Sequence, residues 1–247
     1  DWGNPCQCAA CREIAAREGT NMGPLLYLVN KVAEAVEAEF PDKAIDTLAY
    51  QWSRKPPRNM RPRPNVIIRL CSIECCFSHP LATCDSNENR AFREDIENWA
   101  KVCDRLWVWD YTTSFANYLV PFPNLRVLRP NIQYFVRNHV TGIFEEDNYT
   151  SLLGELSPLG GYMMAKFLWD PDYDQETAMN EFLDGVYGAA APFIRRYIDL
   201  LHDKVEKENI HMHIWEGAGA AYLTDDLLAE ADRLWDQAEA AVAAEPQ

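Results

Sequence analysis

The sequence is poor in basic residues and has no long apolar run. Its 247 residues include 23 Lys and Arg against 38 Asp and Glu, so the formal net charge is −15. We therefore expect no nucleic-acid partner and no anionic membrane surface, because binding to phosphate needs concentrated Lys and Arg. No run of about 18 apolar residues is present, so we also expect no membrane-spanning helix.

Motifs that bind nucleotides or present a nucleophilic serine are also missing. The chain has no G-x-S-x-G, no G-x-G-x-x-G after an expected strand and no P-loop. These absences argue against serine-hydrolase and nucleotide chemistry. No signal peptide is visible. The chain starts at Asp1 without Met, so we expect it to be a processed form or part of a longer protein.

What is present is an alternation of strand and helix patterns over the first 150 residues. Apolar runs predict strands at 44–52, 65–74, 105–111 and 141–147. Helical spacing predicts helices at 23–41, 89–104 and 129–140, the last opened by Pro130. Such alternation favours an α/β fold with parallel strands, either an open sheet or half of a (β/α)8 barrel.

The remainder of the chain shows helical patterns only. They cover residues 160–171, 177–208 and 224–244. We therefore predict two domains, with residues 1–153 as the barrel half and residues 154–247 as a helical region packed on it.

Acidic residues follow three of the four predicted strands. Glu74 ends the second strand, Asp110 the third, and Glu145, Glu146 and Asp147 the fourth. One acid after a strand is ordinarily a capping or turn residue. Three in succession favour chemistry, because acids in a shared cleft of low dielectric have strongly shifted pKa values. Two such carboxyl groups can divide the cleavage of a glycosidic bond, one donating the proton and the other attacking or activating the attacking group.

Aromatic residues make up 12% of the chain, and flat rings with a polar edge can stack on sugars as well as fill a core. The candidates near strand ends are Tyr50, Trp52, Trp109, Tyr111 and Tyr118. For Trp109, core packing is an equal alternative. Asn117 either bonds a sugar hydroxyl or caps a local turn.

The eight cysteines allow three interpretations. Cys6, Cys8 and Cys11 form C-x-C-x-x-C, which can supply most of a tetrahedral zinc site. The fourth ligand would come from Cys76, from a neighbouring cysteine or from His79. A disulfide network and buried thiols remain the alternatives. We expect Cys71 and Cys103 in the core, and we expect His211 and His213 to be exposed or hydrogen-bonded rather than metal ligands.

Long stretches of the chain resemble a known bacterial family. They are "DTLAYQWSRKPPRNMRPRPNVIIRLCSIECCFSHPL", "VWDYTTSFANYLVPFPNL", "GIFEEDNYTS", "MMAKFLWDPDYD" and "EFLDGVYGAAAPFIRRYIDLLH". Up to about His202 the chain is similar to the domain-of-unknown-function family numbered 4838. The resemblance implies a glycoside hydrolase of secreted, periplasmic or surface polysaccharide-degrading proteins. Some members are grouped as glycoside hydrolase family 163, with endo-β-N-acetylglucosaminidase activity on complex N-glycans.

The resemblance implies roles for particular residues. Its "SIECCF", "WDYTT" and "FEEDNY" motifs give Glu74, Asp110 and Glu145 as the catalytic carboxylates. The family's Asp before the cysteine cluster would be Asp1. We expect the substrate-binding residues to be Asp1, Tyr50, Trp52, His79, Trp109, Tyr111, Asn117, Tyr118 and Glu146. Catalysis would need no cofactor, and Cys6, Cys8, Cys11 and Cys76 would hold a structural zinc or form disulfides.

The resemblance also implies that the four strands are strands five to eight of a (β/α)8 TIM-type barrel. The partner of this C-terminal half would be the N-terminal half in the full-length chain. A half-barrel leaves two strand edges unpaired, so either the chain is part of a longer protein or its isolated form is not a competent enzyme. A carbohydrate-binding barrel without activity and a zinc-stabilised structural domain remain the alternatives.

Overall fold

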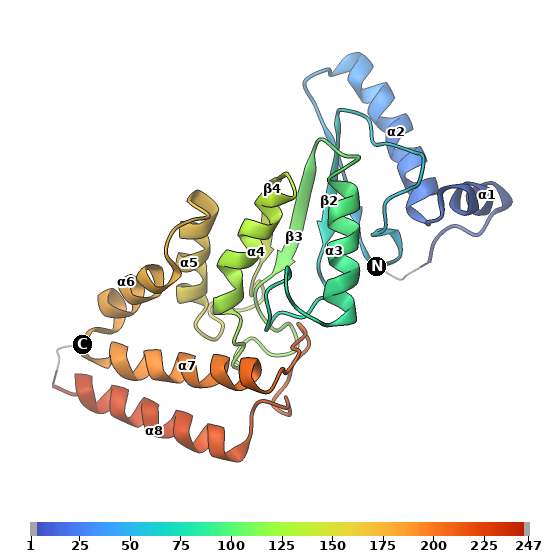
Figure 1. Cartoon of the computed structure of the whole chain (residues 1–247). Helices are drawn as coiled ribbons and strands as arrows, with labels where there is room; N and C mark the ends of the chain where they lie inside the picture. Colours follow the sequence, from blue (N-terminus) through green and yellow to red (C-terminus); the bar gives the residue numbers. More distant parts are fainter. Residues whose placement is uncertain (1–3, 245–247) are drawn as a thin grey trace. The chain divides into compact units, whose positions relative to one another are not determined.

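The computed structural model describes residues 4–244 (Figure 1). The chain divides into two compact units that are interleaved in sequence. The first unit holds the chain up to Cys75 together with Asn87–Tyr111 and Phe135–Glu146. The second holds Cys76–Ser86, Thr112–Tyr134 and the chain from Asp147 onward. The helical unit therefore takes in segments that precede the predicted domain boundary at residue 153, including most of the helix Leu125–Arg137.

The first unit is built on a four-stranded parallel sheet, as predicted. Its strands are β1 (Ile45–Ala49), β2 (Val66–Cys71), β3 (Leu106–Tyr111) and β4 (Val140–Glu146). Their order in the sheet is the order in the chain. Right-handed crossovers that always step in one direction place their helices on one face of the sheet. This is the progression of a (β/α)8 barrel, whereas a doubly wound sheet reverses direction. The topology is consistent with half of a TIM-type barrel.

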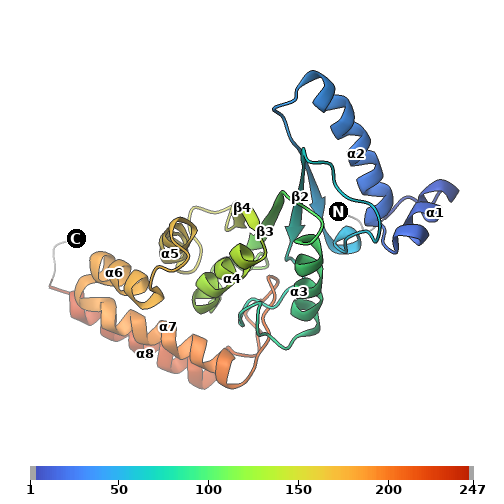
Figure 2. The same cartoon turned by 45° about the horizontal axis from the view of Figure 1, so that its top comes forward.

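The two faces of this sheet differ in burial. The Leu70 face carries Val66, Ile68 and Leu70 of β2 with Leu106 and Val108 of β3, and none of them is more than 1% exposed. Helix α2 (Met22–Glu39) contacts β1 and β2, and α3 (Asn87–Trp99) runs alongside β2 and β3 in both views (Figures 1 and 2). Alternate residues form the opposite face of the sheet.

We call this opposite face the Arg69 face. The guanidinium of Arg69 lies over the rings of Trp107 and Trp109, with its central carbon 5.3 and 5.9 Å from the two ring centroids. Phe144 of β4 meets Trp109 edge-on, with 4.8 Å between ring centroids, and is 45% exposed. The Arg69 face is therefore aromatic and only partly buried.

A bulge in the β3–β4 pairing decides which acid occupies which face. The register shifts between Leu106 and Trp107, so that Trp107 pairs with Gly142. A Cβ at Gly142 would lie 2.5 Å from the Trp107 ring, which explains the glycine. Beyond the bulge, Asp110 pairs with Glu145, and alternation places Glu145 on the Leu70 face and Glu146 on the Arg69 face.

One helix of the first unit was not predicted. Helix α1 covers Ala9–Glu18 and ends in a left-handed Gly19 with φ +71°. Its last residue, Glu18, is 2% exposed and accepts backbone N–H groups of Asn59 and Met60 at 2.9 and 3.0 Å. A buried helix terminus thus orders the Pro- and Arg-rich loop that follows β1.

The second unit is helical, as predicted. It contains α5 (Ser157–Trp169), α6 (Gln175–Tyr187), α7 (Ala191–Lys207) and α8 (Asp225–Val242), with α7 packed on α8. The single helix predicted over 177–208 is wrong, because the chain turns at Gly188, where φ is +49°. Within residues 4–244, no helix combines the length and apolarity that crossing a membrane requires.

The start of α4 (Leu125–Arg137) also differs from the prediction. Pro130 lies inside this helix, which begins five residues earlier. The N–H of Leu125 has no acceptor within the helix, as at every helix start. It donates instead to Nε2 of the buried His202 at 3.0 Å. The His202 ring of α7 therefore allows α4 to begin earlier than Pro130 indicated.

Candidate active site

Asp110 and Glu145 form a buried carboxyl pair. They are direct neighbours on β3 and β4, and Ser72 donates a hydrogen bond to Oδ1 of Asp110. Burial raises the pKa of Asp110 to about 6. Burial, followed by the charge of Asp110, raises the pKa of Glu145 well above its usual range. Within the described part of the chain, Oε2 of Glu145 is buried without a hydrogen-bond partner.

The position of this pair does not favour the predicted catalytic role of either residue. Asp110 follows Leu106 and Val108 in the alternation of β3, so its carboxyl group lies on the Leu70 face of the sheet. In a (β/α)8 barrel, substrates bind at the C-terminal ends of the strands, and the strand side chains that face away from the helices point toward the barrel axis. The catalytic assignment of Asp110 and Glu145 therefore stays a prediction.

Glu146 lies on the Arg69 face, one residue further along β4. Trp109 donates its indole N–H to Oε2 of Glu146 at 2.8 Å. Tyr111 is the residue paired with Glu146 across the strands, and burial, with the charges of Cys71, Tyr50 and Glu146, raises the pKa of its phenol. Trp109 therefore donates a hydrogen bond to this carboxylate in addition to packing on the sheet.

The charges of Glu146 and of Glu74, the acid predicted at the end of the second strand, both affect the phenol of Tyr50. The phenol of Tyr50 is half-buried, and its pKa is raised by burial and then by the charges of Cys71, Glu74 and Glu146. Two carboxylates, one after β2 and one at the end of β4, thus act on the same phenol. Whether the predicted catalytic acids Glu74, Asp110 and Glu145 act at one place stays a prediction, and Glu74 and Glu146 are the two carboxylates whose charges reach this phenol.

Glu74 is held by an ion pair. Its Oε2 lies 2.5 Å from Nη1 of Arg54, and Nε of Arg54 lies 2.7 Å from Asp95 of α3. The Arg54 side chain is 10% exposed, whereas that of Glu74 is 41% exposed. A buried guanidinium anchored to α3 therefore fixes an accessible carboxylate.

The other predicted binding residues lie in different places. Asn117 accepts the N–H of Leu119 at 3.0 Å, as expected for the alternative of a turn cap. Trp52 lies in the 3₁₀ turn Gln51–Ser53 after β1 and is half-buried. His79 belongs to a cysteine and histidine group of the second unit. Asp1 lies outside the described residues.

Tyr118 belongs to an aromatic cluster of the second unit. The cluster consists of Phe115, Tyr118, Tyr149 and Trp215, with ring centroids 5.9 to 6.4 Å apart. Tyr149 is 73% exposed and Trp215 is 62% exposed. Sequence reasoning selected only Tyr118, because Tyr149 and Trp215 come from two other loops.

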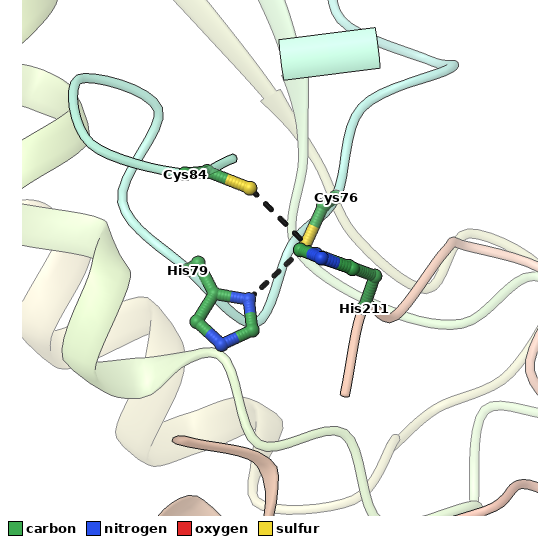
Figure 3. A group of neighbouring side chains, drawn as sticks. All are labelled: Cys76, His79, Cys84 and His211. Atoms are coloured by element: carbon green, nitrogen blue, oxygen red, sulfur yellow. Dashed lines mark hydrogen bonds between the residues drawn. The ribbon is translucent and has the colours of Figure 1, made fainter. Parts of the chain in front are cut away.

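The cysteines form two groups. Cys6, Cys8 and Cys11 lie together in the first unit, and Cys76 and Cys84 lie with His79 and His211 in the second unit (Figure 3). The predicted set of Cys6, Cys8, Cys11 and Cys76 draws on both units and stays a prediction. Cys71 and Cys103 are buried, at 1% and 6% exposure, which confirms their expected place in the core.

A parallel sheet of sequential strands with carboxylates at its C-terminal edge defines an α/β protein of the barrel class. A family model described as Domain of unknown function (DUF4838) matches residues 1–199, and the chain belongs to this family. No curated protein matches the chain, and no solved structure matches it.

Proposed function

We propose that this chain is the C-terminal half of a glycoside hydrolase barrel that cleaves complex glycans. The observation that supports the proposal is the position of Glu74 after β2 and of Glu146 at the end of β4, at the C-terminal edge of one parallel sheet. Glycosidic cleavage needs two carboxyl groups that face one cleft. An endo-β-N-acetylglucosaminidase acting on N-glycans is the particular activity that we propose to test first.

The two carboxylates would divide the reaction. One protonates the oxygen of the leaving sugar, and the other attacks the anomeric carbon or activates the attacking group. With a 2-acetamido sugar, the second carboxylate would orient the amide whose carbonyl oxygen attacks. Tyr50, whose phenol is affected by the charges of both acids, is suited to a hydrogen bond that positions the reacting ring.

The aromatic cluster favours a second candidate function, which is glycan binding without cleavage. Exposed Tyr and Trp rings with a polar edge are suited to stacking on the apolar faces of sugars. Tyr149 and Trp215 present such rings. In a binding protein these rings would carry the function.

A screen of the full-length protein against complex N-glycans distinguishes the two functions. We expect release of a glycan fragment by the wild type and a loss of about 10²–10⁴-fold in E74Q, with the fold kept. If the chain is a glycan-binding protein, W215A should weaken glycan binding. Full turnover in E74Q would remove Glu74 from the mechanism. Binding that W215A weakens, without any cleavage by the wild type, would favour the binding function.

A further inference from the structure

Four potential metal ligands of the second unit converge on one point. They are Cys76, His79, Cys84 and His211, and their ligand atoms all lie within 4.8 Å of one another. Figure 3 shows the two thiol sulfurs and the two imidazole rings directed toward a common centre. Cys76 and Cys84 are buried, and the two histidines are partly buried.

The separations of these atoms match a tetrahedral zinc site. Sγ of Cys76 lies 3.5 Å from Nδ1 of His79 and 3.3 Å from Nδ1 of His211. Sγ of Cys84 lies 3.7 Å from the same nitrogen of His211. Zinc bonds of about 2.3 Å to sulfur and about 2.0–2.1 Å to nitrogen at tetrahedral angles place sulfur and nitrogen about 3.6 Å apart.

The outer contact of His211 is that of a metal ligand. Nε2 of His211 lies 3.2 Å from a carboxylate oxygen of Asp85, and metal-bound histidines usually donate their second N–H to such a group. His79 points Nδ1 toward Cys76 and toward Ser78, at 3.5 and 3.2 Å. Both rings therefore turn Nδ1 to the centre of the group.

The group joins segments that are far apart in sequence. Three ligands lie within nine residues, and the fourth lies 127 residues beyond Cys84. Hydrogen bonds already connect the two segments, from Phe77 N to Met212 O at 2.9 Å and from Ser78 Oγ to Ile210 O at 2.6 Å. A metal ion at this position would fasten a loop to the segment between α7 and α8.

We propose that Cys76, His79, Cys84 and His211 bind one structural Zn²⁺. Thiolate and imidazole are ligands that zinc prefers. Four protein ligands leave no open position for a substrate or a water molecule, which is the arrangement of a structural site. This zinc site is independent of the proposed glycosidase function, because none of the four ligands is one of the proposed catalytic carboxylates, Glu74 and Glu146.

Zinc bound to the purified full-length protein, measured by mass spectrometry, tests the proposal. We expect C84A and H211A each to lose one zinc ion relative to the wild type. A variant with Cys6, Cys8 and Cys11 all changed to Ser should keep that ion, and so should C103A, which removes a buried cysteine outside the group. A strong chelator should lower the Tm of the wild type and leave that of C84A unchanged.

D85N is a second variant that keeps all four ligands. We expect it to fold and to bind zinc about 10–100-fold more weakly in competition with a chelator. Cobalt in place of zinc should give a thiolate-to-cobalt absorption band that C84A lacks. Wild-type zinc content in C84A and H211A would overturn the proposal. A disulfide between Cys76 and Cys84 in the purified protein, found by alkylation and mass spectrometry, would overturn it as well.

Discussion

At the scale of single residues, Glu145 and Glu146 are adjacent in the chain but lie on opposite faces of β4. Glu145 is half-buried beside its strand neighbour Asp110 on the Leu70 face, and Glu146 accepts a hydrogen bond from the indole N–H of Trp109 on the Arg69 face. The sequence marked all the acids of the strand ends. Which of the two adjacent acids lies on which face depends on the bulge at Trp107. The spacing of apolar residues does not reveal this bulge.

The buried carboxyl group of Asp110 makes the free energy of unfolding depend on pH. The pKa of Asp110 is raised to about 6 in the folded protein from an ordinary value of 3.8. A raised pKa means that the folded state binds the proton more tightly than the unfolded state does. Its stabilising contribution is complete below about pH 3.8 and is lost as the pH rises through about 6. The neutral amide of D110N removes this dependence.

We therefore expect the Tm difference between D110N and the wild type to shift in favour of D110N between about pH 4 and pH 7. Thermal unfolding of both proteins in matched buffers measures this difference. A Tm difference that is the same at both pH values would show that Asp110 is ionised throughout.

At the scale of elements, the sequence predicted the strands and most helices well. Apolar runs such as Val66–Cys71 and the amphipathic pattern of α3 are local signals. Helix starts and stops were less predictable, because they depend on distant partners. His202 of α7 accepts a hydrogen bond from the first N–H of α4. No residue near Leu125 in the sequence predicts this contact.

The break between α6 and α7 gives a prediction at this scale. Gly188 has φ +49° and ψ −120°, a conformation that is essentially restricted to glycine. G188A should lower the free energy of unfolding by about 1–3 kcal/mol, measured by urea denaturation. G185A is the matched control, because Gly185 lies inside α6 with open space at its Cβ position.

The control should move in the opposite direction. Alanine at position 185 is expected to raise the free energy of unfolding by about 0.5–1 kcal/mol, since alanine favours helix interiors. An equal loss of stability in G185A and G188A would contradict the proposed role of the positive φ at Gly188.

At the scale of the whole molecule, the four parallel strands were the predictable feature, whereas the alternating patterns left their order open. Alternating patterns gave four parallel strands, and their sequential order then favoured the barrel over the open sheet. The grouping of His211 with Cys76 was not predictable. The sequence offered C-x-x-H-x₄-C from Cys76 to Cys84, but the fourth ligand follows only from the fold.

The half-barrel also shapes our proposal for the complete protein. Within the described residues, β1 and β4 each pair with one neighbouring strand only, and unpaired edges invite further strands. We propose that the N-terminal half of the barrel in the full-length chain adds these strands. It would face Glu74 and Glu146 and close the cleft around the glycan.

Glycan hydrolysis by the full-length E146Q and E145Q variants, compared side by side with the wild type, tests the central claim most directly. The substitutions are chemically identical, adjacent in the chain and on opposite faces of β4. We predict that E146Q loses about 10²–10⁴-fold in kcat/KM, while E145Q stays within a few-fold of the wild type. Wild-type turnover in E146Q together with inactivity of a folded E145Q would contradict the account.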